Sequence, residues 1–366
     1  MTVMLLLLGL ALLLVGAEML VRGASRLALA TGISPLVIGL TVVAFGTSTP
    51  ELAVSIGAAN SGAPDIALGN VVGSNITNVL LILGVSALIA PLIVARQLIR
   101  VDVPIMLGVS VLALVLALDG GIGRVDGAIL AALLVGYTLL QVRLGRSDPA
   151  AGDTALDTVN GPPRGTRAWV MNVALVGGGL ALLILGANWL VDSATLIARQ
   201  FGLSELVIGL TVVAVGTSMP EIATSIIATI RGQRDLAVGN VVGSNIFNLL
   251  GVLGLAAVIS PTGIPVSPAA VNFDIPVMIA TAVACLPIFF TGHSIQRWEG
   301  AVFLGYYVAY TAYLLLDAAG HDALPDFRLA MLWVVMPLTV VTLSVVTWRH
   351  LRSRAAPPTN TPDGSP

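Results

Sequence analysis

The feature that most constrains the fold is an internal repeat. Residues 36–84 align with residues 206–254 without a gap, and 33 of the 49 aligned positions are identical. The similarity continues, with small insertions, to DGAILAALLVGYTLL at 126–140 against EGAVFLGYYVAYTAYLL at 299–315. Similarity over this length indicates that the chain contains two copies of one structural unit.

Both copies are built from apolar blocks. The chain of 366 residues is 57% hydrophobic and 10% charged, whereas soluble proteins carry about 25% charged residues. The blocks are roughly 20 residues long, the length of a helix that crosses the hydrocarbon layer of a membrane. We therefore predict an all-α polytopic membrane protein, and no basic run points to a nucleic acid as partner. The eleven expected helices are 3–30, 35–60, 65–90, 101–119, 125–144, 168–199, 205–230, 235–260, 273–291, 298–317 and 328–348.

Five of these helices fall in each copy of the repeat. Because five is odd, the two copies must enter the membrane from opposite sides. Such inverted-topology repeats are typical of secondary transporters, which bind their substrate near the midplane between the two repeats. The eleventh helix has no counterpart and is an addition. The expected organisation is a first five-helix repeat at 1–144, a cytoplasmic linker at 145–167, a second five-helix repeat at 168–318, an extra transmembrane helix with its preceding loop at 319–350, and a disordered tail at 351–366.

The basic residues predict the orientation. The chain has 17 arginines and no lysine. With the N-terminus outside, fourteen arginines face the cytoplasm and three face the outer side, a strong positive-inside bias. We therefore expect a multi-pass protein of the cell membrane with its N-terminus out and its C-terminus in.

Two hexapeptides place a proline and a carboxylate inside apolar blocks, GTSTPE at 46–51 and GTSMPE at 216–221. Proline removes a helical hydrogen bond, so we expect the carbonyls near Ala44 to Thr47 to be freed for another partner. Backbone freed at membrane depth is tolerated only where it lines a cavity or is buried in protein. A charge at this depth costs about 3 kcal/mol. Because no arginine lies deep in a predicted span, we expect the positive partner to be a cation from solution. The residues sharing one helix face in each copy are Thr47, Ser48 and Glu51, and Thr217, Ser218 and Glu221.

A second repeated motif follows, GNVVGSNITN at 69–78 and GNVVGSNIFN at 239–248. Its serine and last asparagine are four residues apart and therefore share a helix face. We favour ion contact for Ser74, Asn78, Ser244 and Asn248. We favour hydrogen bonds between helices for Asn70, Asn75, Asn240 and Asn245.

The candidate ligands are carboxylate, hydroxyl, amide and carbonyl oxygens. Hard oxygen ligands suit Ca2+ and alkali ions and disfavour copper and zinc. The two carboxylates balance the charge of one Ca2+, and Na+ could occupy overlapping oxygen positions. Ca2+ and Na+ are then transported substrates in a lipid bilayer, and neither a cofactor, an enzymatic activity nor a protein partner is expected.

The paired GTSxPE and GNVVGSN motifs, in two inverted five-helix halves, resemble the cation/Ca2+ antiporter superfamily. Within it, residues 3–318 are most similar to prokaryotic Na+/Ca2+ exchangers. Proton-coupled Ca2+ exchangers of the superfamily carry a glutamate in the second motif, where this chain has GSN. The resemblance therefore favours Na+ coupling.

The resemblance also implies a role for each matched residue. Glu51 and Glu221 would be the principal Ca2+ ligands, together with backbone oxygens of Thr47 and Thr217. The implied Na+ ligands are Ser48, Ser74, Ser218 and Ser244 with the carbonyls of Ala44 and Ala214, while Asn78 and Asn248 line the centre. The first and sixth helices would slide to alternate access.

Two features of the chain depart from the family pattern. Some relatives carry Asp where this chain has Asn78 or Asn248, which argues against K+ dependence. The chain also has an eleventh helix, whereas the family's minimal form has ten.

Other functions are alternatives to Na+/Ca2+ exchange. The first is H+- or K+-coupled Ca2+ exchange. A cation channel and a scaffold protein are less favoured, and the GxxxxGK[ST] sequence of an ATP-driven transporter does not occur.

Overall fold

The structure is a computed structural model that describes residues 2–60, 64–147, 166–202, 214–290, 293–342 and 344–345, almost all of them helical. The first half of the chain comprises α1 (Thr2–Thr31), α2 (Pro35–Ile38), η1 (Gly39–Val43), α3 (Ala44–Thr47), α4 (Thr49–Asn60), α5 (Pro64–Thr77), η2 (Asn78–Leu83), α6 (Gly84–Ile89), β1 (Leu92–Ile93), η3 (Leu98–Asp102), α7 (Val103–Ala117), β2 (Gly121–Ile122) and α8 (Arg124–Ser147). Elements labelled η are π-helical turns within longer helices.

The second half repeats this order. It comprises α9 (Thr166–Gln200), α11 (Ala214–Thr217), α12 (Met219–Ile230), α13 (Arg234–Phe247), η6 (Asn248–Leu253), α14 (Gly254–Ile259), β3 (Ile264–Pro265), η7 (Ala270–Asp274), α15 (Ile275–Phe290), β4 (Ser294–Ile295) and α16 (Arg297–Ala318). After it come α17 (Leu324–Ala330) and η8 (Met331–Val335), which belong to one helix that continues to Thr342.

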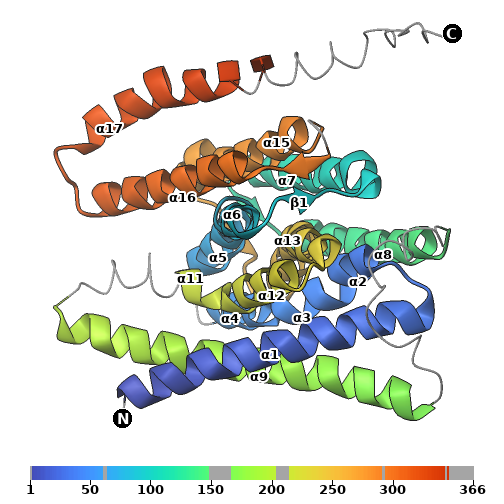
Figure 1. Cartoon of the computed structure of the whole chain (residues 1–366). Coiled ribbons are helices and arrows are strands. Elements are labelled where there is room, and N and C mark those ends of the chain that lie inside the picture. The colour runs from blue at the N-terminus through green and yellow to red at the C-terminus, as the bar shows by residue number, and fades with distance from the viewer. Residues whose placement is uncertain are drawn as a thin grey trace, which may run out of the picture.

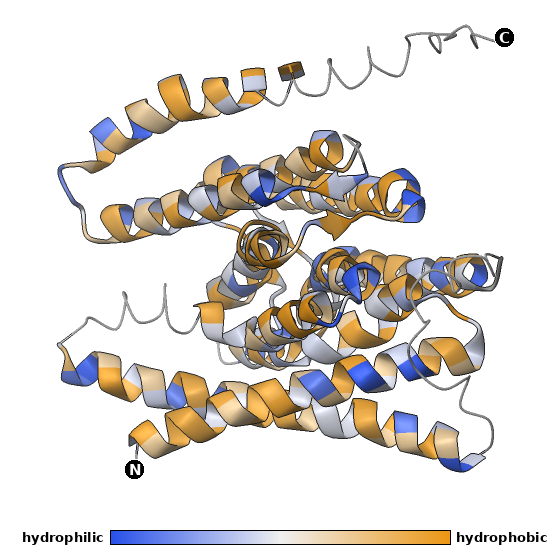
Figure 2. Ribbon diagram, viewed as in Figure 1, coloured by the Kyte–Doolittle hydropathy of each residue, from blue (hydrophilic) through white to orange (hydrophobic). Residues whose placement is uncertain are grey.

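The prediction of an all-α polytopic membrane protein is confirmed. Among the described residues, nine helices are long and apolar enough to cross a membrane, or ten if the bent pair Pro35–Thr47 and Thr49–Asn60 is one span. Hydrophobic residues predominate along these helices (Figure 2). The helix expected at 205–230 lies partly outside the described residues, which contain its last part as α11 and α12. The count of eleven therefore stays a prediction.

The two halves make matching contacts with each other. Strand β1 pairs antiparallel with β4, and β2 pairs antiparallel with β3. Glycines bring two helix pairs into backbone contact, Gly84 of α6 against Gly300 of α16 and Gly127 of α8 against Gly254 of α14. Each contact from the first half to the second thus has a counterpart from the second to the first.

Helix α1 and its repeat counterpart α9 lie side by side along one edge of the molecule (Figure 1). A Cβ atom at Gly9 would lie 2.8 Å from the carbonyl oxygen of Gly186, and one at Gly16 would lie 2.8 Å from that of Gly179. These two pairings show that the helices run antiparallel. Opposite directions are what the odd number of helices per copy predicts, while the side of the membrane on which the N-terminus lies stays a prediction.

The most deeply buried helices lie between this α1–α9 layer and a layer that contains α7, α15 and α16 (Figure 1). In the most apolar stretch of Arg234–Ile259, 83% of the residues are buried, against 0% for Leu324–Thr342. The share is 72% in Ile66–Ile89, so α5 and α13 lie in the interior, whereas α17 lies outside it.

The predicted linker and tail fall mostly outside the described residues. Helix α8 continues to Ser147 and α9 begins at Thr166, so both ends of the linker expected at 145–167 are helical. Residues 148–165 and the tail at 351–366 are not among the described residues.

The glycine contacts between α1 and α9 predict the effect of one added methyl group. A Cβ at Gly179 would lie 2.7 Å from the backbone nitrogen of Leu20, so Gly179→Ala must push the two helices apart. We expect a loss of about 1–3 kcal/mol in unfolding free energy, measured by thermal unfolding of the purified protein in detergent. The control is Gly177→Ala on the same helix, where a Cβ meets nothing within 4 Å. Equal stability of the two variants would contradict this interpretation.

Candidate ion-binding site

The two GTSxPE motifs form breaks between short helices. Helix α3 ends at Thr47 and α4 begins at Thr49, with a bend of 43° in the span. Helix α11 likewise ends at Thr217 and α12 begins at Met219. The residues at the breaks, Ser48 and Ser218, have nearly the same backbone angles, with φ −81° and −86° and ψ 9° in both. The predicted interruption is confirmed, and it falls two residues before each proline.

The carbonyl groups near the first break are less free than the sequence suggested. Pro50 has no N–H, so the Gly46 carbonyl loses its usual helical donor. The Ala44 carbonyl, in contrast, accepts the N–H of Ser48 at 3.0 Å, and the Phe45 carbonyl accepts the hydroxyl of Thr49 at 3.1 Å. The expectation that the carbonyls from Ala44 to Thr47 are released together is therefore wrong. Ala44 can still offer an ion its second lone pair.

The two breaks meet across the interface between the halves. Glu51 is 0% exposed and Glu221 is 1% exposed. The Ser48 hydroxyl donates to Oε1 of Glu221 at 3.0 Å, and the Ser218 hydroxyl donates to Oε1 of Glu51 at 3.2 Å. Each acid thus receives a hydrogen bond from the motif of the other half, so the two carboxylates lie in one buried site.

The other oxygen of each carboxylate has no such donor. Oε2 of Glu51 and Oε2 of Glu221 are buried and have no hydrogen-bond partner among the described residues. The ion pairs between described residues join arginines to Glu18 and Asp317, and none reaches either of the two buried acids. Buried charges are normally paired or bound to metal ions. The two acids therefore form a site that calls for a cation.

The GNVVGSN motifs surround these acids. The Ser74 hydroxyl lies 3.4 Å from that of Ser218, and Asn78 follows one helical turn later. Asn78 and Asn248 each begin a π-helical turn, a feature that is frequent at functional sites. Their Oδ1 atoms, like the Ser244 hydroxyl, are buried without a hydrogen-bond partner among the described residues.

Two asparagines of the same motifs support the acids. Asn70 donates to the backbone oxygen of Glu51 at 3.1 Å and to the Ser55 hydroxyl at 2.9 Å. Its counterpart Asn240 donates to the Ser225 hydroxyl at 3.0 Å. The hydrogen-bonding role predicted for these asparagines is confirmed.

The sequence interpretation passed over both serine partners. Ser55 and Ser225 lie four residues after Glu51 and Glu221, at equivalent positions of the repeat, and both are fully buried. Both serines recur one helical turn after the acid of their motif, and this repetition could have identified them from the sequence.

The threonines of the breaks face these asparagines. The Thr47 hydroxyl donates to Oδ1 of Asn240 at 3.2 Å, and the Thr217 hydroxyl donates to Oδ1 of Asn70 at 3.4 Å. Both bonds cross from one half to the other. The threonine hydroxyls are thus engaged with protein, and the prediction that Thr47 and Thr217 offer backbone oxygens to an ion stays a prediction. Ala44 and Ala214 are the first residues of α3 and α11.

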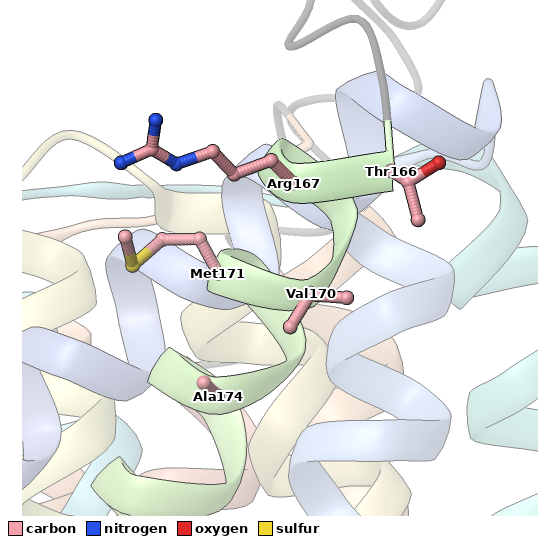
Figure 3. A pocket seen from close by; sticks show the side chains of 5 residues that line it. All are labelled: Thr166, Arg167, Val170, Met171 and Ala174. Carbon is pink, nitrogen blue, oxygen red and sulfur yellow. The ribbon is translucent and has the colours of Figure 1, made fainter.

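Other parts of the described structure offer no comparable set of ligands. A hollow of about 310 Å3 at the start of α9 is lined by Thr166, Arg167, Val170, Met171 and Ala174 and carries no carboxylate (Figure 3). A larger cavity of about 1330 Å3 beside α15, α16 and α17 is lined mainly by apolar side chains. In the described ranges, no group of three or more His, Cys, Asp or Glu side chains could hold a metal ion. Cys285 is fully buried.

The fold and the site define a multi-pass helical membrane protein in which two similar halves each contribute one buried acid. The chain belongs to the sodium/calcium exchanger protein family, which matches residues 1–143 and 171–316. The matched residues include both broken helices and both asparagine-rich motifs.

Individual relatives resemble the chain over most of its length. It is 40% identical to the putative antiporter CaxA of Alkalimonas amylolytica over 315 residues, which cover 85% of this chain and 98% of that protein. It is 34% identical to the sodium/calcium exchanger MaX1 of Methanosarcina acetivorans, covering 85% and 97% of the two chains. A solved structure of the sodium-calcium exchanger NCX_Mj matches with a TM-score of 0.74 and 33% identity, covering 85% of this chain and 98% of that one.

The unpaired acids predict an unusual stability change. Replacing Glu51 with Gln keeps the shape of the side chain and removes a buried charge without a protein partner. In alkaline buffer with choline as the only added cation, we expect Glu51→Gln to unfold at a higher temperature than the wild type, by on the order of 1 kcal/mol in free energy. The control is Glu18→Gln, which loses ion pairs to Arg22 and Arg231 and should be slightly destabilised. A Glu51→Gln variant less stable than the wild type would show that the charge is compensated within the protein.

Proposed function

We propose that the protein is a secondary active antiporter that exchanges Ca2+ for Na+ across the membrane by alternating access. The observation that carries the proposal is the set of buried acceptor oxygens without hydrogen-bond donors, Oε2 of both glutamates and Oδ1 of Asn78 and Asn248. Hard oxygen donors of this kind suit Ca2+ and Na+. The two carboxylates together balance the charge of one Ca2+, and the serine and asparagine oxygens beside them can serve Na+.

The proposed ligand roles are those that the family resemblance implies for the matched residues. Glu51 and Glu221 bind Ca2+, assisted by the backbone oxygens of Thr47 and Thr217. The proposed Na+ ligands are the hydroxyls of Ser48, Ser74, Ser218 and Ser244 with the carbonyls of Ala44 and Ala214, while Asn78 and Asn248 line the centre. The serine hydroxyls that now donate to the carboxylates can rotate and present a lone pair to an ion. Competition for shared ligands then makes binding of Ca2+ and Na+ mutually exclusive.

The names of two relatives support the choice of ions. MaX1 and NCX_Mj are both called sodium/calcium exchangers, and this chain covers nearly the full length of each. The second motif carries no glutamate of its own at GSN, which favours Na+ over H+ as the coupling ion. We place the protein in the cell membrane with its N-terminus outside.

The long helices supply the moving element. Helix α9 contacts both breaks, because a Cβ at Gly46 would meet Leu180 and a Cβ at Gly216 would meet Val191. Cations in the site cancel the charge of the two acids. Helix α9 can then move past the breaks without meeting a charged carboxylate. Helices α1 and α9, which pack tightly on each other, then slide together across the interior helices and open the site to one side at a time.

The coupling ion is tested with purified protein in liposomes. We expect radioactive Ca2+ to enter Na+-loaded vesicles when Na+ is absent outside, and the uptake to vanish when the Na+ gradient is removed. Vesicles of the same composition that carry a K+ or pH gradient in place of the Na+ gradient serve as controls. Uptake driven by a pH or K+ gradient instead would replace the Na+ assignment, and flux that does not saturate with ion on either side would indicate a channel.

The two acids are tested in the same assay. Glu51→Gln and Glu221→Gln each remove half of the ligand charge, so we expect Ca2+ uptake to fall to the level of empty vesicles in both. The control is Asp326→Asn, an exposed acid on α17 far along the chain from both motifs, which should transport like the wild type. Wild-type uptake in either glutamine variant would refute the proposed site.

A further inference from the structure

Two further asparagines lie beside the central pair and are not among the proposed ion ligands. Asn75 and Asn245 are 2% and 3% exposed. Nδ2 of Asn78 donates to Oδ1 of Asn245 at 2.9 Å, and Nδ2 of Asn248 donates to Oδ1 of Asn75 at 3.3 Å. Each central asparagine is therefore held by an asparagine of the opposite half.

Each of these supporting asparagines also reaches a methionine. Nδ2 of Asn245 donates to Sδ of Met106 at 3.4 Å, and Nδ2 of Asn75 donates to Sδ of Met278 at 3.5 Å. Met106 lies on α7 in the sequence VDVPIM, and Met278 lies on α15 in the matching sequence FDIPVM. Both methionines are almost fully buried. The same three-residue contact, a relay of hydrogen bonds, is thus built twice, once on each side of the interface, but Nδ2 of Asn75 also donates to the backbone oxygen of Asn245 at 3.4 Å.

The sulfur atom sets the direction of the relay. An asparagine side chain has an accepting end and a donating end of nearly equal shape, and its orientation is decided by its hydrogen-bond partners. A thioether sulfur has no hydrogen and can only accept. The end of Asn245 that faces Met106 must therefore be its NH2 group, which turns Oδ1 toward Asn78. The end of Asn78 that faces Asn245 must then also be its NH2 group.

We propose that Met106 and Met278 are positioning residues for the ion site. Through Asn245 and Asn75 they fix the amides of Asn78 and Asn248 so that both Oδ1 atoms are left free for a cation. These Oδ1 atoms are the two buried amide oxygens without a hydrogen-bond partner described above. Reversal of either amide would direct two N–H groups at the ion. The inference rests on the proposed function for the identity of the ion, whereas the orientation of the amides is testable without any ion.

The orientation is tested by a double-mutant cycle on thermal stability in alkaline buffer, which favours the ionised form of an introduced carboxyl group, with choline as the only added cation. Leucine has nearly the volume of methionine but cannot accept a hydrogen bond, so Met106→Leu should lower the melting temperature of the wild type by about 1–3 °C. In Asn78→Asp, a carboxylate replaces the NH2 group and faces Oδ1 of Asn245, so two acceptors oppose each other. There Met106→Leu should raise the melting temperature, because Asn245 is released to turn its NH2 group toward the new carboxylate.

This reversal of sign distinguishes positioning from packing. A residue that only fills space would lower the melting temperature equally in both backgrounds, and that result would overturn the proposal. The mirror pair, Met278→Leu with Asn248→Asp, should show a smaller change of the same kind, because the backbone oxygen of Asn245 still accepts from Nδ2 of Asn75. Met171→Leu, at a position on α9 that is 53% exposed, is the control and should shift neither background.

The consequence for the ion is measured as Ca2+ affinity by calorimetry on the purified protein. We expect Met106→Leu to weaken Ca2+ binding about fivefold, the effect of one neutral hydrogen bond. Met278→Leu should weaken it less, because Asn75 keeps the backbone oxygen of Asn245 as an acceptor. Unchanged affinity in both variants would remove the functional part of the proposal. Wild-type uptake in Glu51→Gln or Glu221→Gln would instead refute the proposed function, while the stability cycle would still decide the orientation of the amides.

Discussion

Everything in the interior is arranged around two carboxylates that have no positive partner in the described protein. Glu51 and Glu221 each keep one oxygen for a serine of the other half and leave the second oxygen without a donor. A pair of like charges buried together is unfavourable unless a cation joins it. The site is therefore most stable when it holds the ion that it is proposed to carry.

Neither half can make this site by itself. Ser48 serves Glu221, Ser218 serves Glu51, and the threonine–asparagine bonds beside them also cross the interface. The methionine relay crosses it twice, from Met106 to Asn245 and back to Asn78. The repeat gives each of these residues an equivalent partner in the opposite half, so each contact has a counterpart in which the two halves are exchanged.

The sequence predicted the parts of this arrangement that depend on local chemistry. Proline predicted the helix breaks, the spacing of four residues predicted the shared faces, and the repeated amides predicted hydrogen bonds between helices. It misplaced the details that depend on neighbours. The Ala44 carbonyl stays engaged in its helix because it accepts the N–H of Ser48. Ser55 and Ser225 were passed over because a buried serine in an apolar helix has many ordinary roles.

Sequence alone determined that this chain spans a membrane, that it consists of two similar halves, and which acids are too costly to bury without a cation. These follow from composition, periodicity and the free energy of burying charge, which are properties of the residues themselves. Only the tertiary structure decided that each acid is held by the other half, which oxygens are left without donors, and that Met106 and Met278 lie against the asparagines that hold the central amides. Those outcomes depend on which side chains meet across the interface, and residues about 170 positions apart meet only when the two halves fold against each other.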